Sequence, residues 1–421
     1  MRGSDAEVIV VGAGPAGAAA AAFLARAGVD VLLLDRAHFP RNKPCAEYLS
    51  PEAAQPLDDL GVLSRVEAAG GARLTGMSVT TADGTEFRGD FLAAHGFRGF
   101  RAAGMALRRI VLDEILLDHA RQLGARVALG GAVRDLVRDD GRVVGVELHG
   151  GTVHRAPLVL GADGIRSIVA RRLGVSRTGR WPRRYALVAH HRHVEGMGTR
   201  GEMHVTARGY VGLADVGQGV TNVAVVVPAA HMKDASGDPA TFMDHWLAQV
   251  PHVAPRLAGS VRVAPPVVTG PFNHTVTRAW APGAALVGDA ADFFDPFTGE
   301  GIFAALRGAQ RLLPYAFEAC RAPSTTRQVH ALEAWERARR DTFAGKWRVE
   351  RLVGSAVAMP RVLNFLGRRL RARRDLADLL VGVAGDFVPP SRVLHPSFVL
   401  SLLAGRTGVT PPACPAPERI S

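Results

Sequence analysis

The sequence predicts an α/β protein with three parts: a Rossmann-type nucleotide-binding domain, an antiparallel β-sheet domain and a C-terminal helical region. A β-branched run at residues 8–11 leads into a glycine-rich turn, which is typical of a buried parallel strand that enters a nucleotide-binding loop. Residues 185–194 and 205–227 are rich in strand formers and interrupted by glycine, which indicates an antiparallel sheet. A helical pattern dominates from residue 302 to about residue 403.

The composition is that of a globular protein. The chain has 421 residues, of which 48% are hydrophobic and 21% are charged, and these values exclude the disordered and fibrous classes. It carries 51 Lys and Arg against 39 Asp and Glu, which gives a net charge of +12. Since only three of the 51 are lysine, the excess is almost all arginine. Either compositional bias or an anionic partner would explain this excess of arginine.

Cysteine usage bears on the compartment and on metal binding. The three cysteines, Cys45, Cys320 and Cys414, are too few for a disulfide framework and have no metal-ligand spacing. We therefore expect no metal site and a reducing, cytoplasmic location. Residues 8–25 carry no charge, but glycine and proline interrupt them, so we expect no transmembrane segment.

The first βαβ unit carries a phosphate-binding fingerprint, GxGxxG. The predicted elements are a strand, a helix and a strand at residues 8–11, 18–27 and 31–34. Gly12 permits the tight turn, Gly14 lets the backbone approach a pyrophosphate, and Gly17 allows close helix–strand packing. Asp35 follows the second strand, where its carboxylate can accept hydrogen bonds from ribose hydroxyls. The motif predicts a bound dinucleotide, FAD or NAD, and the alternative is a glycine turn without a ligand.

Two further motifs also follow predicted strands. Gly288 and Asp289 precede the run Pro-x-x-Gly-x-Gly-Ile at residues 296–302, and a carboxylate at such a strand end suits the hydroxyls of a ribityl chain. The glycines of this run would leave free amides at the start of a helix. Asp163 lies in a Gly-Ala-Asp-Gly segment, with Ser167 shortly after it. That segment reads either as part of a nucleotide site or as a turn followed by a helix cap.

In this order the three motifs resemble those of the flavoprotein superfamily of para-hydroxybenzoate hydroxylase, whose members carry GxGxxG, a GADG segment, and GD followed by PxxGxG. The resemblance spans roughly residues 5–320. It implies FAD as the tightly bound nucleotide, with Asp289 on the ribityl chain and Arg109 against the flavin. The family has no separate NAD(P)H domain, so NADPH or NADH would act as a transient reductant.

The resemblance also implies a domain organisation and a set of cofactor residues. The FAD-binding domain would be discontinuous, formed by residues 1–75, 105–180 and 270–325. The substrate-binding β-sheet domain would take residues 76–104 and 181–269, and the C-terminal helical region residues 326–421. The implied FAD-binding residues are Gly12, Gly14, Pro15, Ala16, Gly17, Asp35, Arg36, Arg41, Cys45, Arg109, Asp163, Gly288, Asp289, Pro296, Gly299, Glu300, Gly301 and Ile302.

Within the superfamily the chain is most similar to the geranylgeranyl reductase-related flavoproteins, through residues 39–51, the GADGIRSIVARRLG run and the TGEGI run. This subgroup includes prenyl-chain reductases, quinone-linked dehydrogenases, and oxygenases or halogenases of secondary metabolism. Halogenases carry a lysine near residues 75–80 and a W-x-W-x-I-P segment, and the sequence has neither. Prenyl reductases usually carry Y-x-W-x-F-P, and the best match, residues 210–215, lacks its Trp and Pro. Three scattered cysteines cannot hold an iron–sulfur cluster of the dehydrogenase kind.

We therefore expect an FAD-dependent monooxygenase of secondary metabolism that hydroxylates an aromatic or polyketide-type small molecule with NAD(P)H and O2. One alternative is an FAD-dependent reductase of isoprenoid, geranylgeranyl-type double bonds, and another is a flavin electron-transfer protein. The substrate is aromatic or lipophilic in the first two cases.

Three side chains are candidates for catalysis. Strand alternation in residues 189–194 places His191 and His193 on one face, where a histidine could deprotonate a substrate phenol. The alternative is a pair of partly exposed sheet histidines. Cys45 is either a reactive thiol or a small buried residue near the flavin.

The positive charge is concentrated near the C-terminus. Residues 331–421 hold 15 Lys and Arg against 8 Asp and Glu, and the densest run is residues 368–374. This run predicts either a peripheral membrane contact that collects a lipophilic substrate or a solvated helix face. We expect no nucleic-acid partner, because the sequence contains no recognisable nucleic-acid-binding module.

Overall fold

The centre of the molecule is a mostly parallel sheet. The computed structural model describes residues 4–233 and 237–404, so Cys414 and the end of the predicted helical region lie outside the described residues. The strands of this sheet are β1 (Val8–Val11), β2 (Val31–Asp35), β8 (Arg126–Leu129), β12 (Leu158–Gly161), β21 (Trp280–Ala281) and β22 (Ala284–Leu286). Their order is β21-β22-β12-β1-β2-β8, and all pairs are parallel except β21 with β22. Three distant stretches of chain therefore meet in one sheet.

Helices cover this sheet. They are α1 (Pro15–Arg26), α4 (Arg109–Gln122), α8 (Gly301–Cys320) and the 33-residue α9 (Thr325–Val357). Strands β1 and β2 are buried along their whole length, as their aliphatic sequences predict for strands covered on both faces. The helix predicted to begin at residue 18 begins at Pro15, because Gly14 takes an extended conformation at the N-cap and proline fits the first helical position.

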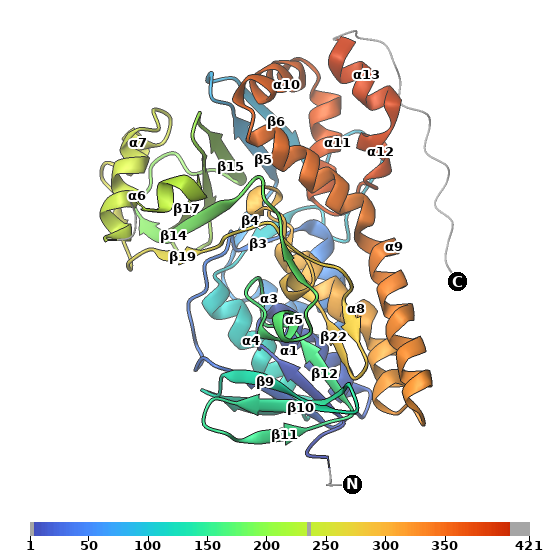
Figure 1. The fold of residues 1–421 in the computed structure, drawn as a ribbon. Helices are drawn as coiled ribbons and strands as arrows, with labels where there is room; N and C mark the ends of the chain where they lie inside the picture. The colour runs from blue at the N-terminus through green and yellow to red at the C-terminus, as the bar shows by residue number, and fades with distance from the viewer. Residues whose placement is uncertain (1–3, 234–236, 405–421) are drawn as a thin grey trace.

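A second large sheet stands above the first (Figure 1). Its strands are β5 (Gly76–Thr80), β6 (Glu86–Asp90), β14 (Arg184–Arg192), β15 (Arg200–Val205), β16 (Tyr210–Asp215), β17 (Val220–Pro228), β18 (Val261–Arg262) and β19 (Val267–Thr269). They follow the order β18-β14-β17-β16-β15-β5-β6, with β19 also on β14. Every pair is antiparallel except β15 with β5. The α/β fold class with an antiparallel sheet and C-terminal helices is thereby confirmed.

The two faces of this second sheet have different neighbours. On one face, aliphatic residues of β14, β16 and β17 pack against α6 (Pro239–Ala248) and the segment that leads to α7 (Ala254–Leu257). On the other face, residues of β5, β6, β14 and β17 pack against the C-terminal helices. These helices are α10 (Pro360–Ala372), α11 (Arg374–Ala384), α12 (Ser391–Leu394) and α13 (Pro396–Ala404).

Shorter elements complete the described chain. There are three small sheets. The first consists of β3 (Tyr48–Leu49), β7 (Gly104–Ala106) and β4 (Ala72–Leu74), and the second of β9 (Val133–Asp139), β10 (Arg142–Leu148) and β11 (Val153–Arg155). The third consists of β13 (Ser176–Thr178) and β20 (His274–Val276). The remaining helices are α2 (Ala54–Leu60), α3 (Leu63–Glu67), α5 (Ile168–Arg172), and the short 3-10 turns η1 (Pro51–Ala53), η2 (Ala229–Lys233), η3 (Gly288–Ala290) and η4 (Pro296–Thr298). Within residues 4–233 and 237–404, no helix has both the length and the apolarity required to cross a bilayer.

The arginine-rich run of residues 368–374 is partly neutralised inside the protein. Arg368 pairs with Asp83, and Arg374 pairs with Asp90, both on or beside the β5–β6 hairpin. Arg373 is buried and pairs with Asp375 at 2.7 Å. The pairs of Arg368 and Arg374 attach α10 and α11 to the second sheet, so this part of the charge has a structural role.

A buried network joins the second sheet to α9. Arg184 of β14 pairs with Asp295 and donates a hydrogen bond to the Gly354 carbonyl at 3.0 Å. Asp295 also accepts from the Tyr210 hydroxyl at 2.8 Å. Since the side chains of Arg184 and Asp295 are buried, each depends on the other for charge compensation.

We predict that Arg184→Met lowers the free energy of unfolding by about 3–5 kcal/mol, because Asp295 loses its buried cationic partner. Urea denaturation followed by circular dichroism measures the change. The adjacent Arg183 is exposed, so Arg183→Met is the matched control and is expected to cost less than about 0.5 kcal/mol. Equal losses in the two variants would contradict the assignment.

Candidate functional site

A deep cavity lies where the carboxyl edge of the central sheet meets the second sheet. The structure brings most of the predicted cofactor residues to its wall, together with side chains of β14–β17, η4 and α9. The predicted residues that line it are Gly14, Pro15, Ala16, Cys45, Arg109, Asp289, Pro296, Gly299, Glu300, Gly301 and Ile302. Three segments far apart in sequence thus contribute to one cavity.

Three of the predicted glycines serve packing. Gly12 has φ +101°, and a Cβ there would lie 2.6 Å from the Ala162 carbonyl oxygen. A Cβ on Gly17 would lie 1.7 Å from the Gly12 oxygen, and one on Gly288 would lie 2.8 Å from the Cβ of Ala16. No side chain larger than hydrogen fits at these positions without moving the backbone. The N-terminus of α1 is therefore held directly against β12 and η3.

Positive charge gathers over the start of α1. Arg109 makes a bidentate pair with the fully buried Asp113, at 2.7 and 2.8 Å, and Arg41 lies 3.2 Å from the same carboxylate. Both guanidinium groups lie within 4 Å of the place that a Cβ on Gly14 would take. Lys43 lines the same end of the cavity. Three cations beside a helix N-terminus suit a bound pyrophosphate.

Asp35 supports the glycine loop from the end of β2. Its carboxylate accepts hydrogen bonds from the backbone N–H of Ala13 at 2.7 Å and of Ala37 at 2.8 Å. Arg41 lies 3.7 Å away. The next residue, Arg36, is exposed, and none of Asp35, Arg36 and Arg41 belongs to the wall of the deep cavity.

Asp289 faces the cavity from η3. Burial raises the pKa of its carboxyl, and the charges of Lys43, Arg109 and His274 oppose that shift. The following turn presents Gly299, with φ +76°, whose Cβ would lie 2.9 Å from the Tyr48 ring. The turn and the start of α8 leave backbone exposed to the cavity, as the motif predicts.

Asp163 belongs to a helix cap. Its carboxylate accepts from the backbone N–H of Ile168 at 2.7 Å, and the Ser167 hydroxyl accepts from the N–H of Ala170 at 2.9 Å. Asp163 is absent from the cavity wall, although Ala162 and Gly164 line it. One carboxylate oxygen of Asp163 therefore caps α5, while the other, Oδ1, is buried without a hydrogen-bond partner, and the implied role of Asp163 in binding the cofactor stays a prediction.

Glu47 is a buried carboxylate that the sequence reasoning did not single out. It has φ +61° and is 2% exposed. It accepts from the backbone N–H of Arg109 at 2.8 Å and from the Asn222 amide at 3.0 Å, and it lies 2.7 Å from the His190 ring nitrogen. It therefore ties the start of α4 to β14 and β17. Its position inside the segment of residues 39–51 was the only sequence signal.

Cys45 lines the cavity, and its sulfur accepts from the backbone N–H of Glu47 at 3.3 Å. Burial raises the pKa of the thiol above its usual value. Cys45 is partly buried, and since the thiolate is the nucleophile, this environment favours the interpretation of a small packing residue over that of a reactive thiol.

The two candidate catalytic histidines lie away from the cavity. In β14 the cavity face carries Ala186 and Val188, whereas His191 lies on the opposite face and contacts the Ser260 hydroxyl at 3.0 Å. Burial, followed by the charge of Arg262, lowers the pKa of His191 to about 4. His193 follows the end of the strand, is exposed and has φ +59°. The predicted alternation places His191 on one face of β14, but the cavity lies against the other face, which carries Ala186 and Val188.

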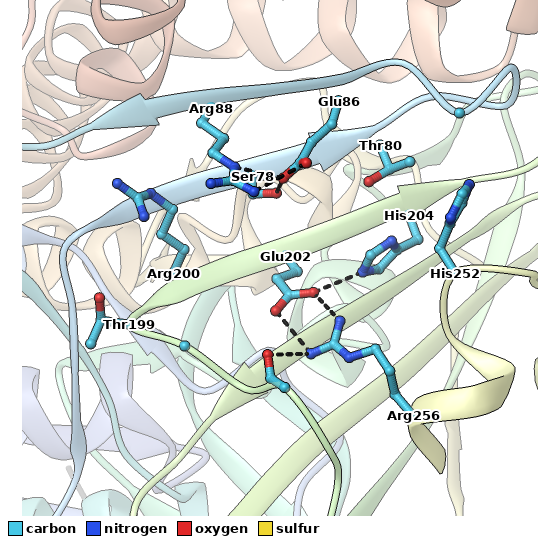
Figure 2. A pocket seen from close by; sticks show the side chains of 13 residues that line it. Ser78, Thr80, Glu86, Arg88, Thr199, Arg200, Glu202, His204, His252 and Arg256 are labelled. Carbon is cyan, nitrogen blue, oxygen red and sulfur yellow. Dashed lines mark hydrogen bonds and ion pairs between the residues drawn. The ribbon is translucent and has the colours of Figure 1, made fainter. Parts of the chain in front are cut away.

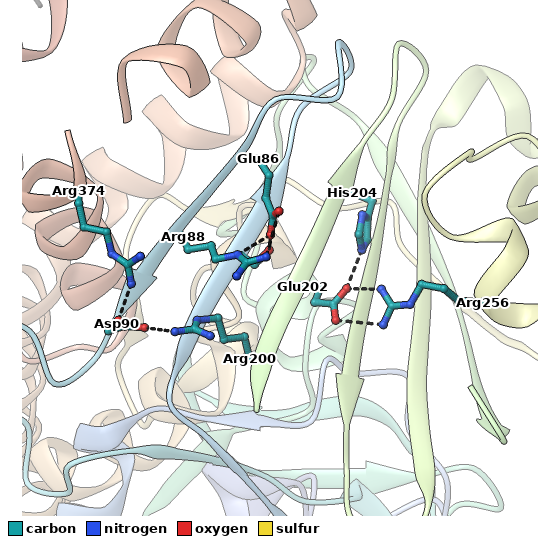
Figure 3. Close-up of polar contacts among 9 residues, drawn as sticks. Glu86, Arg88, Asp90, Arg200, Glu202, His204, Arg256 and Arg374 are labelled. Atoms are coloured by element: carbon teal, nitrogen blue, oxygen red, sulfur yellow. Dashed lines mark hydrogen bonds and ion pairs between the residues drawn. The ribbon is translucent and has the colours of Figure 1, made fainter. Parts of the chain in front are cut away.

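A second, shallower cavity of about 440 Å³ lies on the back of the second sheet (Figure 2). Its charged side chains are already paired with one another. Glu202 accepts from Arg256 and lies 2.9 Å from His204, while Glu86 accepts from Arg88 at 2.7 Å. Along its rim, Asp90 lies between Arg200 and Arg374 (Figure 3). No residue of the three glycine motifs lines this second cavity, so the deep cavity is the candidate site.

The parts of the chain that the structure describes hold no group of three His, Cys, Asp or Glu side chains arranged to bind a metal ion.

Comparisons with known proteins give the same assignment for the fold and the cofactor. A family model described as "FAD binding domain" matches residues 5–315. The menaquinone reductase of Mycolicibacterium smegmatis is 31% identical over 408 residues, with 91% of this chain and 92% of that protein covered. Digeranylgeranylglycerophospholipid reductase 2 of Methanopyrus kandleri is 32% identical over 315 residues, with 71% and 74% covered.

Solved structures share the fold at lower identity. A flavoprotein/dehydrogenase from Cytophaga hutchinsonii superposes with a TM-score of 0.81 at 21% identity, covering 95% of this chain and 98% of that one. PqsL, "a probable FAD-dependent monooxygenase" from Pseudomonas aeruginosa, superposes with a TM-score of 0.69 at 20% identity, covering 85% and 98%. At these identities the likeness is one of fold.

We predict that Asp289→Asn weakens FAD binding about 10- to 100-fold, because a hydrogen bond to an ionised group is lost at constant volume. Absorbance at the flavin band per polypeptide after gel filtration, and an FAD titration of the stripped protein, measure the loss. Asp341→Asn, an exposed change on α9, is the control. An unchanged flavin content in Asp289→Asn would refute the assignment.

We predict that His191 makes the protein less stable as the pH falls from about 6.5 to 4. The folded pKa is about 4 and the usual value is 6.5, so the unfolded chain binds more protons in this window. His191→Gln removes that difference, and its melting temperature is expected to fall less with acidification than that of the wild type. His193→Gln, at an exposed position, serves as the control. Parallel curves for all three proteins would show that His191 titrates normally.

Proposed function

The chain belongs to the FAD binding domain family of FAD-dependent oxidoreductases, and from this premise we propose that it saturates carbon–carbon double bonds of an isoprenoid chain. The observation that carries the proposal is the apolar floor of the cavity, which continues from the flavin-binding turn across the second sheet. The reductant is a nicotinamide dinucleotide, NADPH or NADH, and the substrate is lipophilic.

The residues at the cavity fit FAD. Arg41, Lys43 and Arg109 stand beside the start of α1 for the pyrophosphate, and Asp289 faces the cavity for the ribityl hydroxyls. A Cβ on Gly301 would have its nearest neighbours at 3.8 and 3.9 Å, so the start of α8 leaves room for a ring. When bound, FAD supplies hydride transfer. The chain holds the dinucleotide, orients the substrate beside it and excludes water.

The floor of the cavity suits a flexible hydrocarbon chain. Strands β14–β17 present small and aliphatic groups to it, and their residues are Ala186, Val188, Gly201, Met203, Gly212, Ala224 and Val226. Leu74, Met77 and Phe272 extend the apolar wall. The polar side chains that the same strands add, Glu202, Tyr210 and Asn222, have their hydrogen-bond partners within the protein. The surface therefore offers mainly apolar contact area, as a polyprenyl chain requires.

The relatives support reduction over oxygen insertion. The two proteins that match at 31% and 32% identity are named as reductases, and menaquinone and digeranylgeranyl lipids both carry polyprenyl chains. The likeness to PqsL concerns the fold alone. The sequence alone favoured an aromatic hydroxylase, with the reductase as the alternative. With the relatives taken into account, we propose the reductase first.

Hydroxylation is the second candidate, and one observation favours it. Strand β16 runs Tyr210-Val211-Gly212-Leu213-Ala214-Asp215, without the Trp and Pro of the prenyl-reductase segment. Tyr210 is held by Asp295. A cavity with Gly212 in place of an indole has room for a compact ring system.

Anaerobic turnover separates the two candidates. We predict that the FAD-loaded protein with NADPH or NADH, menaquinone or a geranylgeranyl lipid, and no oxygen yields a product with two added hydrogen atoms, as mass spectrometry detects. The product must keep both hydrogen atoms after it is re-oxidised in air, because a quinol would lose them and a saturated chain would not. A product that forms only in air and carries one added oxygen atom would overturn the proposal in favour of hydroxylation. Asp289→Asn, depleted of flavin, serves as the control.

A further inference from the structure

Helix α13 is apolar on the side that faces solvent. On its inner side, Phe398 and Leu402 pack into the core cluster that α10 shares with the second sheet. On its outer side, Val399, Leu400 and Leu403 are 43%, 64% and 49% exposed. The helix contains no charged residue. Since a helix that is apolar all round is normally covered on every side, the outer face of α13 is a contact surface.

The helices next to α13 expose further apolar side chains. Helix α10 packs against both α9 and α13, and the C-terminal helices gather at the end of the molecule opposite β9–β11 (Figure 1). The exposed residues are Leu352 on α9, Met359 between α9 and α10, and Val362 on α10. Among the described residues, six of the thirteen large apolar side chains that are exposed lie between residues 352 and 403. Exposed apolar surface is therefore concentrated at this end.

Arginine accompanies these apolar side chains. Residues 351–404 contain eight arginines and three aspartates, without lysine or glutamate. The three aspartates are already in ion pairs, with Arg373, Arg374 and Lys346. Within the described parts of the chain, the arginines of this segment that form no ion pair are Arg351, Arg361, Arg369, Arg371 and Arg392. Their charge is therefore free to attract an anionic partner.

Helix α10 turns its free arginines away from the core. Its buried side carries Leu363, Gly367 and Leu370, which are spaced as one face of a helix. Arg361 lies on the opposite side and Arg371 lies at its margin, and both are exposed. Because α10 and α13 pack into the same core cluster, the basic outer face of one and the apolar outer face of the other belong to the same end of the molecule.

We propose that this end, formed by the outer faces of α10 and α13 and the end of α9, docks on the surface of a bilayer that contains anionic lipid. The apolar side chains enter the boundary between headgroups and acyl chains, and the free arginines attract the lipid phosphates. This inference goes beyond the reductase function, and neither its argument nor its test depends on turnover.

A bilayer matches this surface better than the two other candidate occupants. A second copy of the chain, packed symmetrically on the same face, would bring arginines against arginines. Residues 405–421, which follow α13, contain four prolines and only two large aliphatic residues, Val409 and Ile420, so they offer little apolar surface to cover the helix. An anionic membrane is complementary both to the free arginines and to the exposed apolar side chains.

Sedimentation of the full chain with lipid vesicles tests the apolar part of the surface. We expect binding to vesicles of phosphatidylcholine with phosphatidylglycerol, weaker binding to phosphatidylcholine alone, and loss of binding as the salt concentration rises. Leu400→Glu is expected to weaken binding to the mixed vesicles about 10-fold, because an inserted apolar side chain becomes an anion. Val153→Glu on β11, which is 41% exposed at the opposite end of the molecule, is the matched control and should bind as wild type does.

The same measurement tests the arginines. Arg361→Gln and Arg371→Gln are each expected to weaken binding to the mixed vesicles about 5-fold, because each removes one cation from the surface that faces the lipid phosphates. Arg337→Gln, an exposed arginine in the first half of α9, is the matched control. Equal effects of all three changes would show that only the net charge of the protein matters, and would overturn the assignment of this face.

Three other results would also overturn the proposal. Wild type that does not bind the mixed vesicles, or equal losses in Leu400→Glu and Val153→Glu, would show that the outer face of α13 does not meet lipid. A wild-type dimer in light scattering that Leu400→Glu converts to a monomer would assign the face to a second copy. A lower melting temperature of Leu400→Glu with unchanged vesicle binding would assign the face to the chain itself.

Discussion

The contact between Gly12 and the backbone of Ala162 is the constraint on which the site depends. Parallel pairing of β1 with β12 brings these residues together, and a Cβ at Gly12 would come within 2.6 Å of the Ala162 oxygen. The same pairing aligns β22, so Asp289 emerges beside the start of α1. The site is thus assembled from three distant segments because one sheet edge collects them. Any side chain at residue 12 would separate two of them.

The elements that could be predicted are those whose signal is local. Residues 8–11 form a strand that is buried throughout, and the glycine and proline residues that follow it indicate the turn. The same holds for the turn before α8, where Gly299 takes φ +76°. In each case the residue type is required by its own backbone conformation, so the residue and its immediate neighbours carry enough information.

The features that could not be predicted depend on contacts across the fold. Period-two alternation separates His190 from His191, but it cannot tell which face of β14 meets the cavity, because α6 covers the other face. Glu47 receives donors from residues 109 and 222, which no local pattern connects. The sequence around Asp163 also does not show that one of its carboxylate oxygens caps α5, because that contact depends on where the helix begins.

The charged side chains along the deep cavity are separated into a cationic end and an acidic end. Cations gather at the start of α1, where they are tied to Asp113, while carboxyl groups gather at the start of α8, where Lys346 balances only part of their charge. Between them the second sheet presents mainly small and aliphatic side chains, and its polar residues Tyr210 and Asn222 already have hydrogen-bond partners inside the protein. The middle of the cavity therefore offers mostly apolar contact area between two charged ends, and low dielectric there strengthens the interactions of each end.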